Sequence, residues 1–188
     1  MSSDFSVCVV DDDRPNLNMI RAMLETMNIK DIRCYSDAVH AWSDIQVTAP
    51  DFIISDWNME PVSGIELLRQ VRSDRSLCAT PFVMVTANTS EDYWKQAIEA
   101  GVSEFLFKPF PLAMFRDTIS DVCAHLSISE ASGYEQRVRG SSGCVDWRAS
   151  ERQMDPAASI NFAPARCDKV IRHSFRRIRR GVLESNNH

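Results

Sequence analysis

The side chains best suited to chemistry stand at the ends of four short apolar runs. They comprise three consecutive carboxylates, one separate carboxylate, one hydroxyl and one ammonium: Asp11, Asp12, Asp13, Asp56, Thr86 and Lys108. Carboxylates that lie close together repel one another, and each raises the pKa of its neighbours unless a cation neutralises them. A site with several carboxylates and open positions suits Mg²⁺, which prefers oxygen ligands and keeps some of its waters. These residue types therefore indicate a magnesium site, provided that the fold brings them together.

A carboxylate in such a site can also act as a nucleophile. Its attack on a phosphoryl group gives an acyl phosphate, and a metal ion beside that group offsets the charge on its oxygens. The hydroxyl of Thr86 and the ammonium of Lys108 could hold the remaining oxygens. Each feature alone is weak evidence, because acidic clusters often cap helices and a Lys-Pro pair often forms a turn. Their combination, with each member at the end of an apolar run, favours phosphoryl chemistry.

The apolar runs themselves are predicted to be β-strands. They are too short for helices, and most are rich in Val, Ile or Phe. The five runs are residues 7–10, 32–35, 52–55, 81–86 and 105–107. The second run, which contains Cys34 and Tyr35, has the weakest strand pattern.

Segments with the apolar spacing of helices follow the strands. Pro15 suits the first turn of a helix. One face of that helix carries the apolar residues Leu17, Ile20, Met23, Leu24 and Met27. Further helices are expected after Asp37, over residues 65–71, from Ser90 to Gly101 and from Pro111 to Leu126. The alternation predicts an α/β fold, a doubly wound, flavodoxin-like parallel sheet of five strands in the order 2-1-3-4-5. The carboxyl ends of such strands converge on one surface, so the polar residues would form one site.

Four segments of the chain resemble the signature segments of the CheY-like receiver family of response regulators. These segments are VCVVDDDRPN, FIISDWNMEPVSGIELLRQVR, VMVTAN and EFLFKPF, and the resemblance covers about residues 5–126. It implies a signalling switch of a two-component system. In that role, Asp56 would accept a phosphoryl group from a histidine kinase or a histidine phosphotransfer protein, with Mg²⁺ as the cofactor.

The resemblance also implies which residues bind the metal. Asp11 and Asp12 match the metal-binding acidic pair, with Asp56 as a further ligand and Asn58 contributing its backbone carbonyl. The acidic pair could instead be Asp12 and Asp13. The family places its pair directly after the strand, which favours the first choice and leaves Asp13 to approach the following helix.

Further roles are implied for residues near the ends of the fourth and fifth strands. Thr86 resembles the switch hydroxyl and Phe105 the aromatic switch residue, while Lys108 resembles the invariant lysine. Pro109 matches a proline whose preceding peptide bond is typically cis in the family. Asn88, like Asn58 after the acceptor, matches a position that tunes the lifetime of the acyl phosphate.

The loop after the acceptor departs from the family pattern. Pro61 stands one place later than the usual proline, and Ser63 replaces the common aspartate before Gly64. These changes affect the shape of the loop and partner recognition more than the chemistry. Trp57, next to Asp56, is expected to lie at the rim of the site as a bystander.

The charge balance divides the chain into two parts. Residues 1–126 carry nineteen acidic and ten basic side chains, whereas residues 127–188 carry seven and eleven. The first part is the predicted receiver domain, and the second is a mostly irregular tail. Within the tail, Gly- and Ser-rich residues 127–168 are predicted to be a flexible linker. Residues 169–182 could form a basic amphipathic helix, and residues 183–188 a disordered end.

Three roles for the tail stay open: a solvated extension, a helix that docks on a partner, and an Arg-rich contact with nucleic acid or a membrane surface. Only one amphipathic segment is visible in it, so there is no clear DNA-binding domain. The chain as a whole could also be a phosphorylation-independent adaptor with a receiver fold. The intact acidic site argues against this alternative.

Other classes of protein are not supported by the sequence. Neither a P-loop nor a dinucleotide-binding glycine motif occurs, and no C-x-x-C or close Cys/His pair indicates a zinc site. No apolar run approaches a membrane span in length, and the absence of an export signal predicts a cytoplasmic protein. We expect a switch rather than an enzyme, a monomer or weak dimer with an unidentified downstream partner.

Overall fold

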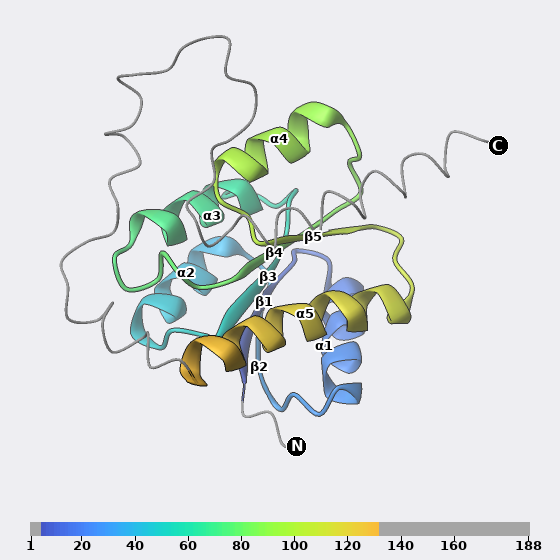
Figure 1. The fold of residues 1–188 in the computed structure, drawn as a ribbon. Coiled ribbons are helices and arrows are strands. Elements are labelled where there is room, and N and C mark those ends of the chain that lie inside the picture. Colours follow the sequence, from blue (N-terminus) through green and yellow to red (C-terminus); the bar gives the residue numbers. More distant parts are fainter. Residues whose placement is uncertain (1–4, 132–188) are drawn as a thin grey trace, which may run out of the picture. The chain divides into compact units, whose positions relative to one another are not determined.

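Strands and helices alternate throughout the computed structural model, which describes residues 5–131 (Figure 1). The strands are β1 (Ser6–Val10), β2 (Asp31–Tyr35), β3 (Phe52–Asp56), β4 (Phe82–Thr86) and β5 (Glu104–Phe107). The helices are α1 (Arg14–Thr26), α2 (Ala38–Val47), α3 (Gly64–Ser73), α4 (Glu91–Glu99) and α5 (Leu112–Ala131). All five predicted strands are confirmed, including the second.

The strands form one parallel sheet in the order β2-β1-β3-β4-β5. This order confirms the predicted doubly wound α/β fold. Helices α1 and α5 cover one face of the sheet, and α2, α3 and α4 cover the other (Figure 1). Because each strand connects to the next through a helix, the carboxyl ends of all five strands lie at the same edge.

The sheet separates two apolar cores. Alternate residues of a strand point to opposite faces, so Val7 packs with side chains of α1 and α5, whereas Cys8 packs with those of α2 and α3. Strands β3 and β4 are buried along their whole length, as expected for a parallel sheet covered on both faces. Their last residues, Asp56 and Thr86, are therefore buried polar groups at the ends of mainly apolar strands.

Caps at the helix starts hold the loops that leave this edge of the sheet. The Asp37 carboxylate accepts a hydrogen bond from the backbone N–H of His40 at 2.9 Å and caps α2. At the start of α3, the Glu66 carboxylate accepts hydrogen bonds from both the N–H and the hydroxyl of Ser63. Such caps satisfy polar groups that a helix end leaves unpaired.

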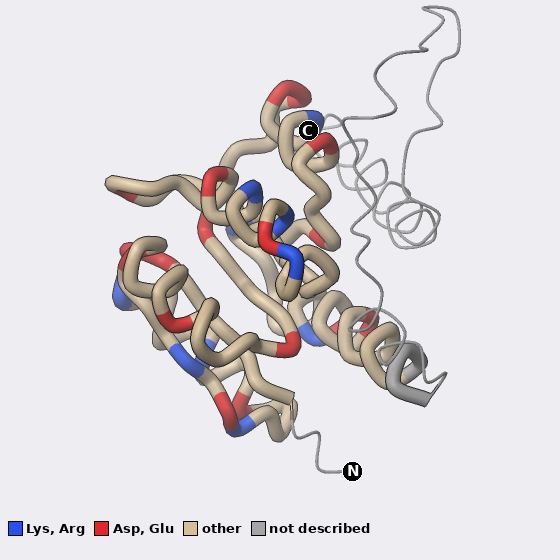
Figure 2. The backbone as a smooth tube through the Cα atoms, turned by 90° about the vertical axis from the view of Figure 1, so that its left-hand side faces the viewer, with Lys and Arg blue, Asp and Glu red and all other residues tan. Residues whose placement is uncertain are grey.

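In the part of the chain that the structure describes, Lys and Arg are scattered among Asp and Glu (Figure 2). No helix among residues 5–131 combines the length and apolar character needed to cross a membrane. Helix α5 runs on to Ala131. The predicted basic helix at 169–182, the disordered end at 183–188 and the linker from residue 132 onward lie outside the described residues.

Arg72 of α3 contacts the loops that precede β4 and β5. These loops lie at the amino ends of the strands, whereas the acidic residues lie at the carboxyl ends. Its Nε donates to the carbonyl of Gly101 at 2.8 Å, and its Nη1 donates to the carbonyls of Thr80 at 2.8 Å and Cys78 at 3.2 Å. We predict that Arg72→Met lowers the free energy of unfolding by about 2–3 kcal/mol, because partly buried carbonyls lose charged donors. Urea denaturation measures this change. Arg69→Met, at an exposed position of the same helix, is the control, and equal losses in the two variants would contradict the assignment.

Candidate functional site

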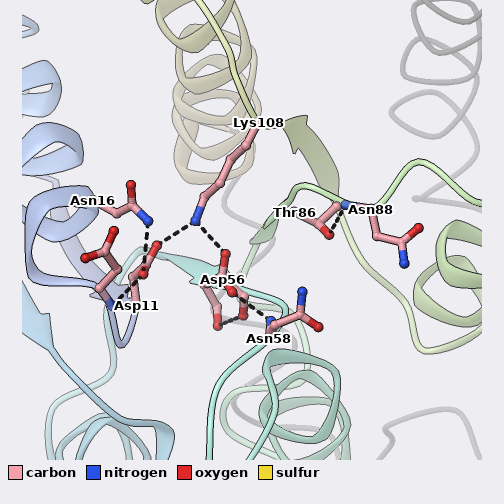
Figure 3. A network of polar contacts seen from close by, with 9 residues as sticks. Asp11, Asn16, Asp56, Asn58, Thr86, Asn88 and Lys108 are labelled. Carbon is pink, nitrogen blue, oxygen red and sulfur yellow. Dashed lines mark hydrogen bonds and ion pairs between the residues drawn. The ribbon is translucent and has the colours of Figure 1, made fainter.

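Three residues from distant parts of the sequence meet at the carboxyl edge of the sheet. The Nζ atom of Lys108 donates to Asp11 Oδ2 at 2.9 Å and to Asp56 Oδ1 at 2.6 Å (Figure 3). Asp11 is 1% exposed and Asp56 is 7% exposed. One ammonium therefore serves two buried carboxylates, each of which follows or ends a different strand.

The backbone of β3 and its loop hold Asp56 in place. The second oxygen of its carboxylate, Oδ2, accepts a hydrogen bond from the backbone N–H of Asn58 at 2.7 Å. The buried hydroxyl of Ser55 donates to the carbonyl of Asp56 at 2.9 Å. Gly64 passes so close that a Cβ atom at this position would lie 2.0 Å from the same carbonyl oxygen. Glycine is thus required where α3 begins, because any side chain would push the end of β3 away.

Asp11 is oriented by the start of α1. Its Oδ1 atom accepts hydrogen bonds from the backbone N–H of Asp13 at 2.9 Å and from the side-chain amide of Asn16 at 3.4 Å. Asp12 and Asp13 are exposed, and Asp13 is the N-cap residue of α1. The structure therefore brings Asp11 to Asp56 and Lys108, with Asp12 at the exposed side of the acidic run.

The charges of the site do not balance. Burial raises the pKa of Asp56, and the nearby Asp11 carboxylate adds to this effect, while the Lys108 ammonium opposes it. Burial works to lower the pKa of Lys108, but its hydrogen bonds to Asp56 and Asp11 outweigh burial and raise that pKa above its ordinary value. One cation faces two carboxylates, so the site can take up a further cation.

The oxygen atoms of the site fit such a cation. Among residues 5–131, no group of three or more His, Cys, Asp or Glu side chains is arranged as a metal cluster. The donors expected from the sequence are the carboxylates of Asp11 and Asp56, which lie together here, with the exposed Asp12 and the backbone carbonyl of Asn58. All are oxygen donors, and Mg²⁺ takes few protein ligands because it keeps several waters. The set suits hydrated Mg²⁺ better than a metal that prefers nitrogen or sulfur.

Thr86 and the loop that follows it lie beside the acidic residues. The hydroxyl of Thr86, which is buried, accepts a hydrogen bond from the backbone N–H of Asn88 at 3.0 Å (Figure 3). The side-chain carbonyl of Asn88 in turn accepts from the backbone N–H of Ser90, the N-cap residue of α4, at 2.9 Å. Thr86 is thus connected to the start of α4 through hydrogen bonds.

The fifth strand carries the remaining predicted residues. Phe105 is half-buried, and its ring stacks on that of Phe107 with centroids 5.9 Å apart. The Lys108–Pro109 peptide bond is cis, as the family resemblance implies.

The prediction that Trp57 lies at the rim of the site is wrong. The residue is only 5% exposed and packs in the core beneath α3 and α4. Sequence reasoning also gave no role to Ser55 and Asn16. A hydroxyl inside an apolar strand and an amide at the end of the first signature segment were the available signals.

Known proteins resemble the chain over the described part. A sequence model of the response regulator receiver domain matches residues 7–120. The chain is 25% identical over 126 residues to the chemotaxis protein CheY-3 of Vibrio cholerae, a match that covers 67% of this chain and 97% of that protein. It is 31% identical over 116 residues to the chemotaxis protein CheY of Pseudomonas aeruginosa, which covers 62% and 94%.

Solved structures share the arrangement of strands and helices. The chemotaxis response regulator CheY4 of Vibrio cholerae superposes with a TM-score of 0.60 at 28% identity, over 64% of this chain and 99% of that one. The receiver domain of the sensor histidine kinase PA1611 from Pseudomonas aeruginosa has a TM-score of 0.60 at 21% identity, over 65% and 99%. That structure is described with a magnesium ion coordinated in its active-site cleft.

The raised pKa of Asp56 has a consequence for stability. Folding disfavours the ionised form of this carboxyl, so the penalty is absent below the ordinary value of 3.8 and fully present above the raised pKa, including at neutral pH. We predict that Asp56→Asn raises the free energy of unfolding at pH 7 in a chelating buffer, because the amide carries no charge that folding must bury. The gain should shrink as the pH falls towards the ordinary range of an aspartate.

Urea denaturation across a pH series measures this difference. Asp31→Asn, at an exposed position where β2 begins, is the control and should change stability little. A loss of stability in Asp56→Asn at neutral pH would show that Lys108 stabilises the ionised carboxylate more than burial disfavours it.

Proposed function

The chain belongs to the response regulator receiver family of two-component signalling, and on that premise we propose that it is a switch operated by phosphorylation of Asp56. The phosphoryl donor is a histidine kinase or a histidine phosphotransfer protein, and Mg²⁺ is the cofactor. The observation that carries the proposal is the contact of one ammonium, that of Lys108, with both Asp11 and Asp56. The switch acts by changing which partner it binds, rather than by turning over a substrate.

The proposed reaction transfers a phosphoryl group from a histidine imidazole to the carboxylate of Asp56. A carboxylate oxygen of Asp56 attacks the phosphorus of a phosphohistidine, a P–O bond forms, and the P–N bond breaks with its electron pair returning to the imidazole. Lys108 already lies 2.6 Å from Asp56 Oδ1, so its ammonium can move to an oxygen of the incoming phosphoryl group without leaving the site. Mg²⁺ held by Asp11, Asp12, Asp56 and the Asn58 carbonyl would offset charge on the phosphoryl oxygens.

The phosphoryl group adds a charge of about −1.5 to −2 where two carboxylates already share one ammonium. Thr86 can donate its hydroxyl to a phosphoryl oxygen, and a rotation of its side chain would break the 3.0 Å hydrogen bond from the N–H of Asn88. Asn88 also contacts the start of α4, because its side-chain carbonyl accepts a hydrogen bond from the N–H of Ser90. Phe105 then rearranges on β5, and the surface formed by α4, β5 and α5 changes.

The relatives support this proposal. The similar chemotaxis proteins match the chain over most of their own length. The magnesium ion described for the PA1611 receiver domain supports the choice of metal.

Trp57 offers a direct test because it adjoins Asp56 and its ring is buried. We predict that Mg²⁺ changes its fluorescence and that acetyl phosphate or beryllofluoride changes it again, since each ligand alters the charge at the neighbouring residue Asp56. Titration of the full chain measures both steps, and Trp57→Phe identifies its signal among the four tryptophans.

Asp56→Asn is the matched control for this titration, since it keeps the shape of the side chain and removes the nucleophile. It should abolish the second step. If the folded wild-type chain responds to neither Mg²⁺ nor the phosphoryl donors, the protein is an adaptor that binds without phosphorylation, and the proposal is wrong.

A further inference from the structure

Helix α4 is the least embedded helix near the candidate site. Ala97 is its one buried residue, while Tyr93, Trp94 and Ile98 are half-buried. Tyr93 lies on the inner side of the helix and contacts Trp57, with ring centroids 5.0 Å apart and ring planes tilted by 45°. The ring of Trp57, the residue after Asp56, therefore forms part of the apolar surface on which α4 packs.

Trp57 cannot move independently of Asp56. It directly follows the acceptor, its backbone N–H donates to the carbonyl of Val85 at 2.9 Å, and its carbonyl accepts from the N–H of Gly64 at 2.9 Å. Its side chain is enclosed by the core. A shift of the acceptor loop is therefore transmitted to the ring, because closely packed interiors pass on displacement rather than absorb it.

Two separate connections thus lead from the site to the first turns of α4. One is polar and runs from the Thr86 hydroxyl through Asn88 to the N–H of Ser90. The other is aromatic and runs from Asp56 through Trp57 to Tyr93. The polar connection depends on the rotation of one hydroxyl, whereas the aromatic one persists when that hydroxyl turns away.

We propose that Tyr93 is a positioning residue that couples the placement of α4 to the state of Asp56 through the ring of Trp57. This inference rests on the proposed phosphorylation of Asp56. When the loop beyond Asp56 adjusts to a phosphoryl group, the Trp57 ring shifts, and the contact with Tyr93 displaces α4. Because coupling is reciprocal, a partner that fixes α4 also changes the affinity of the site for its ligands.

The alternative is that Tyr93 only fills space under the helix. In that case, weakening any apolar contact of α4 would change the response of the helix to a ligand at Asp56 as much as weakening the contact between Tyr93 and Trp57. Ile98 provides the comparison, because it is half-buried on the same helix and packs against the same core.

The test measures hydrogen–deuterium exchange of the peptide that covers Glu91–Glu99 in the full chain, with and without Mg²⁺ and beryllofluoride. In the wild type, the mimic should change exchange in this peptide. In Tyr93→Leu, exchange without ligand should be roughly two- to tenfold faster, the factor that corresponds to the loss of one aromatic pair. The change caused by the mimic should then be at most half that of the wild type.

Two further variants separate coupling from packing. Tyr93→Phe keeps the ring and should behave as the wild type. Ile98→Val should speed exchange without reducing the effect of the mimic. A wild-type effect of the mimic in Tyr93→Leu, or an equal loss of that effect in Ile98→Val, would overturn the proposal.

The fluorine resonance of bound beryllofluoride is recorded on the same samples. If the resonance is absent from the wild type, the proposal that Asp56 is phosphorylated is wrong, and so is the proposed coupling. If the resonance is present in Tyr93→Leu and exchange in α4 still responds to the mimic as in the wild type, the proposed coupling through Tyr93 is wrong, while the phosphorylation of Asp56 stands.

Discussion

The ammonium of Lys108, shared between Asp11 and Asp56, is the interaction on which the site depends. A carboxylate taken out of water is strongly disfavoured unless a partner compensates it. The parallel sheet buries both carboxylates at one edge and supplies a single cation from the end of β5. The remaining negative charge leaves the site able to accept a further cation, which under the proposed function is Mg²⁺.

The surroundings of Asp56 set it apart from the other carboxylates at this edge of the sheet. Its carboxylate receives a hydrogen bond from Asn58 and one from Lys108, whereas the exposed Asp12 and Asp13 lie where water solvates them. Close approach of the backbone at Gly64 fixes the strand that carries it. The same loop continues into Trp57, whose ring packs under α4. Asp56 is therefore held by the core on one side and faces Lys108 and Asp11 on the other.

Much of the fold and part of the site follow from the sequence. Short Val- and Ile-rich runs predict the strands, and parallel topology requires Asp11, Asp56 and Lys108 to share one edge. The sequence does not reveal contacts that depend on how side chains and backbone pack, such as the burial of Trp57 against Tyr93. It likewise cannot show that Gly64 approaches the carbonyl of Asp56, because that distance is set by the docking of α3 on β3.

The central claim is that Asp56 is the residue that carries the phosphoryl group. An acyl phosphate is reduced by borohydride to an alcohol, which converts a phosphorylated aspartate to homoserine. After incubation of the full chain with Mg²⁺ and acetyl phosphate, followed by reduction and proteolysis, mass spectrometry should find homoserine at position 56. Homoserine at Asp12 or Asp13 instead, or at no position in a folded sample, would contradict the account.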